Sequence, residues 1–568
     1  MKQRIEVWST TLSLQTPRAL QLLLTAILVA TLLPTVAWAQ ADPLGHEDRA
    51  RSLYRVVVSL DSAGHPVLPV SVFEHGTQIE VSAPGGLRVL GTGDGSVEFR
   101  LPGSKPLIVT ATDLKPGRKD YWVAVSRAPA NDLLSLRRVI KTWKAWGHRV
   151  RPRGMGATYG LKGRVLDTRA TVLCLDTPFP TDAAARKRAA ILAAERHRDV
   201  FVHTELAEPP TARLSATSAA GAEVRAADVL WFEAATPGAQ LTVVGHGPGP
   251  DRQMLLPGRV YVVPGDGGGL AVVNEVRIET LLEGVVAAEI FSSAPPAALR
   301  AQAVAARTDL LAKVGLRHRS DPFSICSEVH CQAYRGARRI PKSIAAAVHF
   351  TRGQVLTGQD GRLVDTFYHA ASGGHTEHNE NAWRMNPHPC LRGRSDLQPG
   401  AVDHLAGGPT EAAVKALLDG PDRSFAAASG KNKKVLRWSV TRTWPEIRSH
   451  MAKVGVHKPV RALRILKRGV SGRIIEVELT LVDDRKVRIW GELRIRRAFH
   501  ALRSSLFLVT PGPLGGDGAP VSWRFRGAGF GHGVGLDQTG AYGRAKRGQT
   551  FPQILSHYYN GSRLEKLY

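Results

Sequence analysis

Residues 273–314 read VNEVRIETLLEGVVAAEIFSSAPPAALRAQAVAARTDLLAKV, and this stretch decides the fold of the C-terminal half. Apolar side chains recur at helical spacing over 277–288, which predicts an amphipathic helix that ends at Glu289. A second helix is expected to run to about Val314, with Ser293 near its cap and proline in its first turn. The many alanines of this second helix allow close packing against other elements.

Glu289 is expected to lie at a helix end, beside a tight turn and next to an apolar surface. A carboxyl group loses solvation in such a place, which raises its pKa and suits it to act as a general acid. From composition alone, a surface glutamate without a task is the more ordinary interpretation. The case for Glu289 therefore depends on the segments around it.

The helix pair and several later segments together resemble the SpoIID/LytB domain, the family of sporulation stage II protein D and of the amidase enhancers. The matching segments follow in order: LLEGVVAAE at 281–289, ALRAQAVAART at 298–308, CSEVHCQAY at 326–334, YHAASGGHTE at 368–377, SGR at 471–473, GFGHGVGLDQ at 529–538 and YYNG at 558–561. The resemblance spans about 271–568. The sequence departs from the family at Ile290-Phe291, where Met-Pro is common, and at Ala370-Ala371, where polar residues often stand.

This resemblance implies a lytic transglycosylase that cleaves peptidoglycan glycan strands lacking stem peptides, with Glu289 as its single catalytic acid and base. One carboxyl group would protonate the leaving oxygen and then accept the proton of the muramyl 6-hydroxyl, leaving a 1,6-anhydro end. The candidates for binding the sugar are Gln302, Arg307, Tyr368, Ser372, His532 and Gln538. Because Gln302 and Arg307 lie ~140° apart around their helix, at most one of them is expected to face the cleft.

The glycines at every second position from 527 to 535 superficially suggest a phosphate-binding loop. A dinucleotide loop needs a strand before it and a helix after it within a βαβ unit, so tight backbone packing at the glycan cleft is the preferred interpretation. His532, within this run, either points into the cleft or bridges backbone groups.

His318, Cys326 and Cys331 are a candidate zinc set, because some family members carry zinc at a corresponding His-Cys-Cys set. Zinc requires three or four nitrogen or sulfur ligands, and a structural site is the expected type. The competing interpretation is a Cys326–Cys331 disulfide, which an oxidising compartment allows. Cys174 is expected to be a buried strand residue, and the role of Cys390 is open.

The N-terminal half predicts several smaller units. Residues 1–39 have the basic start, apolar run and Ala37-Trp38-Ala39 site of a cleaved signal peptide. A small β unit is expected at 50–115 and a βαββαβ module at 121–206. The order of that module resembles a SPOR domain, which binds denuded glycan strands, although an ordinary α/β repeat gives the same pattern.

The predicted fold class is thus α+β and multidomain, with a C-terminal mixed α/β catalytic domain of SpoIID type. Residues 207–228, rich in Pro, Ala, Ser and Thr, are interpreted as a linker. The catalytic domain is then expected at 229–568, interrupted by an inserted loop at 397–435 that is rich in Gly, Pro, Asp and Lys.

The formal net charge of +27 predicts a surface that attracts polyanions. Export argues against nucleic acid, so the expected partner is the peptidoglycan of the periplasm or outer cell wall. No transmembrane segment is expected after signal cleavage, because no later stretch is apolar enough. The alternative function is a non-enzymatic wall-binding protein that stimulates a cell-wall amidase.

Overall fold

The computed structural model describes residues 52–54, 58–91, 97–196, 200–248, 250–328, 331–337, 340–383 and 385–568. Helices and strands are mixed along the chain, so the predicted α+β class is confirmed. The predicted signal peptide at 1–39 lies outside the described residues. Within the described residues, no helix combines the length and the apolar character needed to span a membrane.

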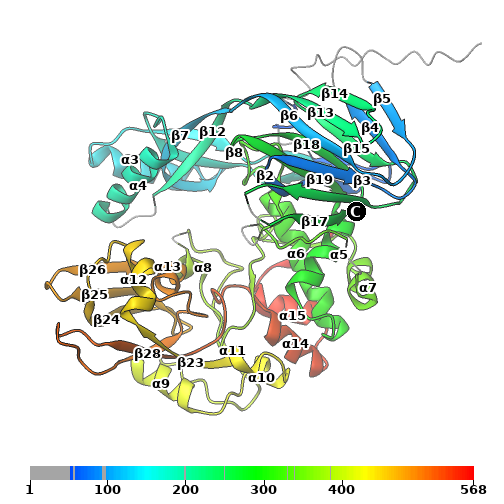
Figure 1. The fold of residues 1–568 in the computed structure, drawn as a ribbon. Helices are drawn as coiled ribbons and strands as arrows, with labels where there is room; N and C mark the ends of the chain where they lie inside the picture. The colour runs from blue at the N-terminus through cyan, green and yellow to red at the C-terminus, as the bar shows by residue number, and fades with distance from the viewer. Residues whose placement is uncertain are drawn as a thin grey trace, which may run out of the picture. The chain divides into compact units, whose positions relative to one another are not determined.

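Two sheets make up the β-rich part of the described chain (Figure 1). The eight-stranded sheet contains β1 (Ser59–Leu60), β2 (Pro66–Gly76), β19 (Gly269–Arg277), β18 (Arg259–Gly265), β15 (Leu230–Ala234), β4 (Leu87–Gly91) and β5 (Val97–Leu101), with β20 (Ile325–Cys326) parallel to β2. The six-stranded sheet contains β14 (Glu223–Ala227), β13 (Thr211–Ser218), β6 (Leu107–Lys115), β3 (Gln78–Ser82), β16 (Leu241–His246) and β17 (Arg252–Leu256). Leu68 and Val70 of the first sheet and Ile79 and Val81 of the second belong to one buried cluster.

Three predicted boundaries are wrong in this region. The strands of 50–115 do not form a separate unit, because they pair with strands of 211–277. The predicted linker at 207–228 instead contains β13 and β14, since its small residues alternate between buried and exposed as in a strand. The predicted domain start at 229 falls inside the same two-sheet unit.

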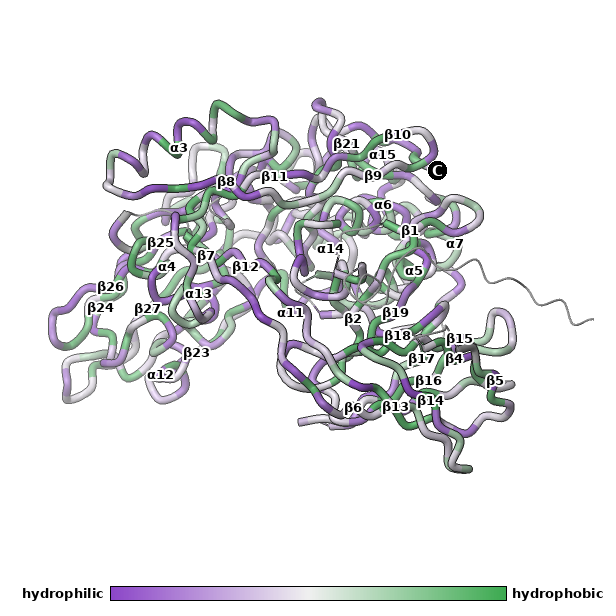
Figure 2. The backbone as a smooth tube through the Cα atoms, turned by 90° about the horizontal axis from the view of Figure 1, so that it is seen from above, coloured by the Kyte–Doolittle hydropathy of each residue, from purple (hydrophilic) through white to green (hydrophobic). Residues whose placement is uncertain are grey.

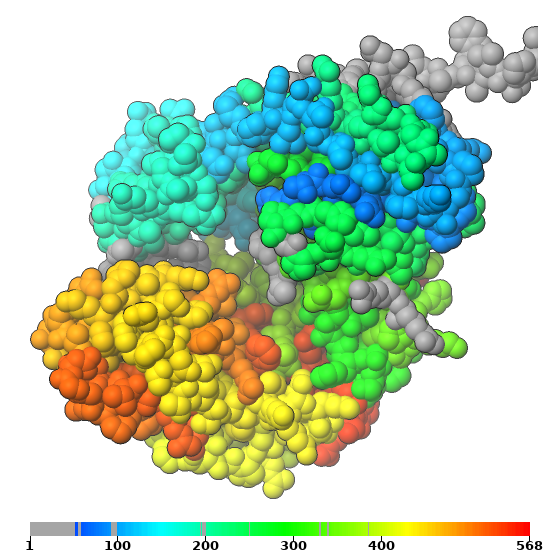
Figure 3. Space-filling model, viewed as in Figure 1, coloured from blue at the N-terminus to red at the C-terminus, as the bar shows by residue number. Residues whose placement is uncertain are grey.

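A module inserted between β6 and β13 has the βαββαβ order expected for 121–206, with an additional hairpin, β9 and β10, between its second and third sheet strands. It comprises β7 (Arg118–Pro129), α3 (Leu133–Ala145), β8 (Val150–Met155), β9 (Thr158–Leu161), β10 (Arg164–Asp167), β11 (Ala170–Leu175), α4 (Asp182–Arg196) and β12 (Phe201–Glu208). Its antiparallel sheet has the order β12-β7-β11-β8, and α3 and α4 share a buried cluster with it. Asp132 caps α3 by accepting a hydrogen bond from the Ser135 N–H. The module is the cyan surface in Figure 3.

After β19 the chain forms a group of helices in which α6 (Pro296–Lys313) is central and four other helices pack against it. The four are α5 (Ile278–Glu289), α7 (Lys342–Phe350), α14 (Gln538–Lys546) and α15 (Phe551–Tyr558). Both predicted helices are confirmed as α5 and α6, but α6 begins after Pro295 and not at Ser293. Helix α6 is buried over most of its length, because alanines let its neighbours approach closely. Two short strand pairs, β21 (Gln354–Thr357) with β30 (Arg563–Lys566) and β22 (Tyr368–His369) with β29 (Leu536–Asp537), join distant parts of the chain.

The segment between β22 and β29 folds around a buried cluster of its own. Its elements are α8 (Asn379–Ala382), α9 (Glu411–Asp419), α10 (Phe425–Ala428), α11 (Lys433–Leu436), β23 (Arg437–Thr443), α12 (Trp444–Ala452), β24 (Val460–Arg468), β25 (Ile474–Leu481), β26 (Lys486–Trp490), α13 (Glu492–Ala498), β27 (Phe507–Pro511) and β28 (Ser522–Ala528). The predicted inserted loop at 397–435 contains α9 and α10, and Val414 and Leu417 pack with Leu506. Hydrophobic and hydrophilic stretches are interspersed along the backbone in Figure 2. In α9 the buried side chains are those of Val414, Leu417 and Leu418, which recur at helical spacing.

Candidate active site

Glu289 is the last residue of α5, and its side chain is half-buried. Its Oε1 atom accepts a hydrogen bond from the Ala333 N–H at 3.3 Å. Burial raises the pKa of the Glu289 carboxyl and the Asp309 charge adds to that rise, whereas the Ala333 bond and Lys313 oppose it. The net effect is a raised pKa, which favours a carboxyl that carries a proton to deliver.

Tyr368 lies within electrostatic reach of Glu289, although it comes from a different element. Burial, together with the charges of Glu289 and Asp309, raises the pKa of Tyr368 well above its usual value. The phenol therefore stays protonated and can donate a hydrogen bond beside the carboxyl group. Of the predicted sugar-binding residues, Tyr368 is the one whose pKa is raised by the charge of Glu289.

Gln302 and Gln538 are brought together across α6 and α14. The Gln538 Nε2 atom donates to Gln302 Oε1 at 3.4 Å. Gln302 is fully buried, whereas Gln538 is half-exposed. Gln538 can therefore meet a ligand directly, and Gln302 can act only through it.

Arg307 does not fit its predicted role in binding the sugar, because it is fully buried and its donors are occupied. Its Nε and Nη2 atoms donate to the Glu279 carboxylate at 2.9 and 2.7 Å, and Nη1 donates to the Gln354 carbonyl at 3.1 Å. Tyr568 donates to the same carboxylate at 2.7 Å. Arg307 thus links α6 to Glu279 of α5, and through Glu279 to the C-terminal Tyr568. It lies on a different side of α6 from Gln302, as the ~140° between them predicted.

Ser372 is also misassigned as a sugar ligand, since it is fully buried. Its N–H donates to Asp537 Oδ2 at 2.7 Å, and its Oγ accepts from the Gly374 N–H at 3.2 Å. Arg473, from the turn between β24 and β25, donates to the Ser372 carbonyl at 2.9 Å. This serine organises the backbone behind the site.

For His532, the structure favours the interpretation that it bridges backbone groups. Its Nδ1 accepts from the Val534 N–H at 3.1 Å, so the Nε2–H donates to the Tyr368 carbonyl at 3.0 Å. Burial lowers the pKa of His532 to about 3, which keeps the ring neutral. The imidazole ring of His532 packs against the rings of Phe367, His369 and Trp383.

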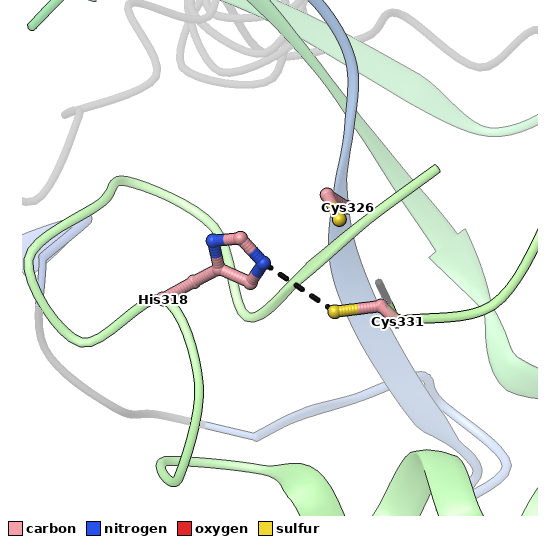
Figure 4. Close-up of side chains that lie close together, drawn as sticks. All are labelled: His318, Cys326 and Cys331. Carbon is pink, nitrogen blue, oxygen red and sulfur yellow. Dashed lines mark hydrogen bonds between the residues drawn. The ribbon is translucent and has the colours of Figure 1, made fainter. Parts of the chain in front are cut away.

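His318, Cys326 and Cys331 gather at a buried point near the two-sheet unit, as Figure 4 shows. One potential ligand atom from each residue lies within 4.8 Å of the others, and Cys331 Sγ is 3.4 Å from His318 Nε2. His318 Nδ1 and Asp321 Oδ2 are 2.9 Å apart, which directs Nε2 toward the sulfur atoms. Both cysteines are thiols in the structure and are not joined as a disulfide. The donor set fits zinc, which takes sulfur and nitrogen ligands.

The comparisons with known proteins match the half of the chain that holds this geometry. A family model described as Stage II sporulation protein matches residues 266–357, which contain Glu289 and the His-Cys-Cys set. Stage II sporulation protein D of Bacillus amyloliquefaciens is 24% identical over 316 residues, 51% of this chain and 74% of the relative. The predicted resemblance to the SpoIID/LytB family is confirmed by these matches.

Other relatives agree with this assignment. The amidase enhancer of Bacillus subtilis (strain 168) is 26% identical over 299 residues, which are 50% of this chain but 40% of that relative. An uncharacterized protein of Brachyspira hyodysenteriae is 27% identical over 293 residues, 51% of this chain and 67% of the relative. A domain of unknown function (DUF8618) matches residues 377–535, so a second model covers the segment between β22 and β29.

Sequence reasoning missed three polar residues of the SpoIID site: Asp309, Lys313 and Gln332. All three are buried, and Asp309 acts on the charge of Glu289. A signal was present for two of them, because an acid and a base stand four residues apart in an otherwise apolar, alanine-rich helix. For Gln332, nothing in the sequence marked it out among the residues of the Cys-containing loop.

Proposed function

We propose that this SpoIID/LytB protein is a lytic transglycosylase that cleaves MurNAc-GlcNAc bonds in glycan strands lacking stem peptides. The observation that carries the proposal is the half-buried Glu289 at the end of α5, whose carboxyl accepts the Ala333 N–H and whose pKa burial raises. A stage II sporulation protein D and an amidase enhancer among the relatives support work on the cell wall.

The reaction needs one group that gives and then takes a proton. Glu289 transfers its proton to the glycosidic oxygen as the bond from that oxygen to the muramyl C1 breaks. The muramyl 6-hydroxyl then bonds to C1, and its proton returns to the Glu289 carboxylate, which yields a 1,6-anhydro end and restores the acid. A pair of carboxylates, as in common glycosidases, is not required because no water attacks.

Zinc is proposed as a structural ion held by His318, Cys326 and Cys331. Bound zinc would cross-link these three residues and stabilise the loop that continues to Ala333, the residue whose N–H contacts Glu289. No chemical step is assigned to the metal.

Export to the periplasm or cell wall is proposed from the leader-like sequence at 1–39. The inserted βαββαβ module is proposed to bind denuded glycan, as its SPOR-like order suggests. Its topology is that of a split βαβ unit, which proteins of many unrelated functions share. Glycan binding by the module therefore needs its own test.

The second candidate function is a non-enzymatic amidase enhancer, favoured by the name of one relative. Digestion of denuded and peptide-bearing strands with purified protein distinguishes the two. Mass spectrometry is expected to find anhydromuramyl ends from denuded strands only. Intact strands, combined with faster peptide release when an amidase is added, would instead establish the enhancer.

A further inference from the structure

A buried ion pair lies on α6 close to Glu289. Asp309 and Lys313 are one helical turn apart and are 2% and 8% exposed. The Lys313 ammonium donates to Asp309 Oδ2. A buried pair costs desolvation energy that an apolar pair would not, so its presence in an alanine-rich helix requires an explanation other than stability.

The ion pair holds two successive residues of the Cys-containing loop, Cys331 and Gln332. Lys313 Nζ donates to the Cys331 carbonyl at 3.3 Å. Gln332 Nε2 donates to Asp309 Oδ2 at 2.7 Å and to the Ala306 carbonyl at 3.1 Å. The next N–H, that of Ala333, is the one that donates to Glu289. Asp309 is therefore connected to the Glu289 carboxyl group by two hydrogen bonds and the short stretch of chain from the Gln332 side chain to the Ala333 N–H.

The position of Asp309 on α6 agrees with this connection. At ~100° per residue, Gln302, Asp309 and Lys313 fall within a narrow stripe, and Arg307 lies on another side. Asp309 interacts electrostatically with both Glu289 and Tyr368. Its Oδ1 atom is buried and has no hydrogen-bond partner among the described residues, so the carboxylate retains acceptor capacity on this side.

We propose that Asp309 is a positioning residue for Glu289, acting through Gln332 and the 331–333 backbone. The inference rests on the proposed function, because it deepens the account of the same site. Asp309 compensates the buried charge of Lys313 and anchors Gln332, and the Ala333 N–H then fixes the orientation of the Glu289 carboxyl toward the glycosidic oxygen. Losing this order costs catalysis more than substrate affinity.

The test compares Asp309→Asn with a matched control at a second buried ion pair, which Glu279 of α5 forms with Arg307 on another face of α6. Glu279→Gln removes the charge partner of Arg307, so it also leaves a buried cation without its carboxylate, but its bonds lead away from Glu289. Per folded molecule, Asp309→Asn is expected to lower kcat on denuded strands by about 10–100-fold with KM nearly unchanged. Glu279→Gln is expected to leave both constants near those of the wild type.

Gln332→Leu provides a second variant that removes the connection without changing charge. It is expected to lower kcat to a similar extent, and the double variant with Asp309→Asn is expected to lose little more, because both act through one connection. If Asp309→Asn does not fold, Gln332→Leu alone decides, and an unchanged kcat would overturn the proposal. Zinc content is measured in parallel, and a loss of kcat that follows loss of metal would also overturn it.

The remaining outcomes distinguish a failure of the positioning role from a failure of the proposed transglycosylase activity. Cleavage by the wild type, with equal losses in Asp309→Asn and Glu279→Gln or with additive effects in the double variant, would refute the positioning role alone. No cleavage by the wild type would refute the transglycosylase, and the role of Asp309 with it.

Discussion

At the scale of single residues, the proposed reaction depends on one half-buried carboxyl group, that of Glu289. Glu289→Gln is expected to lower the release of anhydromuramyl products from denuded strands by ~10²–10⁴-fold, because the amide cannot deliver a proton. Binding to the strands should persist, since glutamine keeps the shape of the side chain. Product release is measured by mass spectrometry and binding by co-sedimentation.

The matched control for this substitution is Glu283→Gln. Glu283 lies on the same helix, is half-buried, and has a pKa that burial and Glu279 also raise. It is expected to turn over substrate like the wild type. Comparable turnover by Glu289→Gln would instead contradict the acid–base mechanism and favour the amidase enhancer.

His532 gives a residue-scale prediction for the effect of pH on stability. Its pKa is lowered in the fold to about 3, below the value of an exposed imidazole, so the unfolded chain binds a proton first as the pH falls. The stabilisation is therefore complete above about pH 6.5 and is lost progressively toward pH 3. Protonation would also place a hydrogen on Nδ1, opposite the Val534 N–H.

The measurement is the free energy of unfolding by denaturant between pH 7 and pH 4, for the wild type and for His532→Gln. The variant is expected to be less stable at neutral pH but to lose less stability on acidification, by up to ~1.4 kcal/mol per pH unit. Parallel pH dependences of the two proteins would contradict a neutral, backbone-bridging histidine.

At the scale of elements, the loop from His318 to Ala333 connects the two-sheet unit with the site. Protein purified without reductant is expected to contain about one zinc ion per chain, measured by elemental analysis. Cys326→Ser should lose the metal and lower both Tm and activity, because the loop loses its cross-link. Cys174→Ser, which changes a buried thiol of β11 in a separate cluster, should keep the metal.

Two results would contradict this assignment. A mass decrease of two hydrogens, with no metal, would show a Cys326–Cys331 disulfide instead. A Cys326→Ser variant with unchanged Tm and unchanged activity would exclude both cross-links.

The elements also show how far the sequence could be interpreted. Helices α5 and α6 were predictable because their apolar spacing is long and regular. Strand β13 was missed because Ala212, Leu214 and Ala216 supply an apolar face that is too small to stand out in composition. The burial of Arg307 and Ser372 depends on partners far away in sequence, so no local pattern revealed it.

At the scale of the whole molecule, the inserted module is attached to the segment that follows α6. Tyr159 donates to the Leu311 carbonyl at 2.9 Å, Thr168 donates to the Val314 carbonyl at 2.8 Å, and the Gly156 N–H donates to the Gly315 carbonyl at 2.8 Å. These bonds join the module to the chain a few residues before His318.

The module is expected to bind glycan by itself. A fragment covering 116–210 should be retained on insoluble sacculi treated with amidase, and less on untreated sacculi, if it recognises strands without peptides. Pulldown followed by gel densitometry measures the retained fraction. No retention on either material would rule out glycan binding by the module.

The place of the insertion has a consequence for folding kinetics. Lys115 of β6 pairs with Thr211 of β13, and just beyond them Arg118 pairs with Glu208 within the module. Without the module's own fold, joining β6 to β13 would require closing a long loop, which slows strand pairing. Once β7 and β12 have paired, β6 and β13 are held as close together as a short hairpin turn would hold them. Folding of the module first is therefore expected to speed closure of the six-stranded sheet.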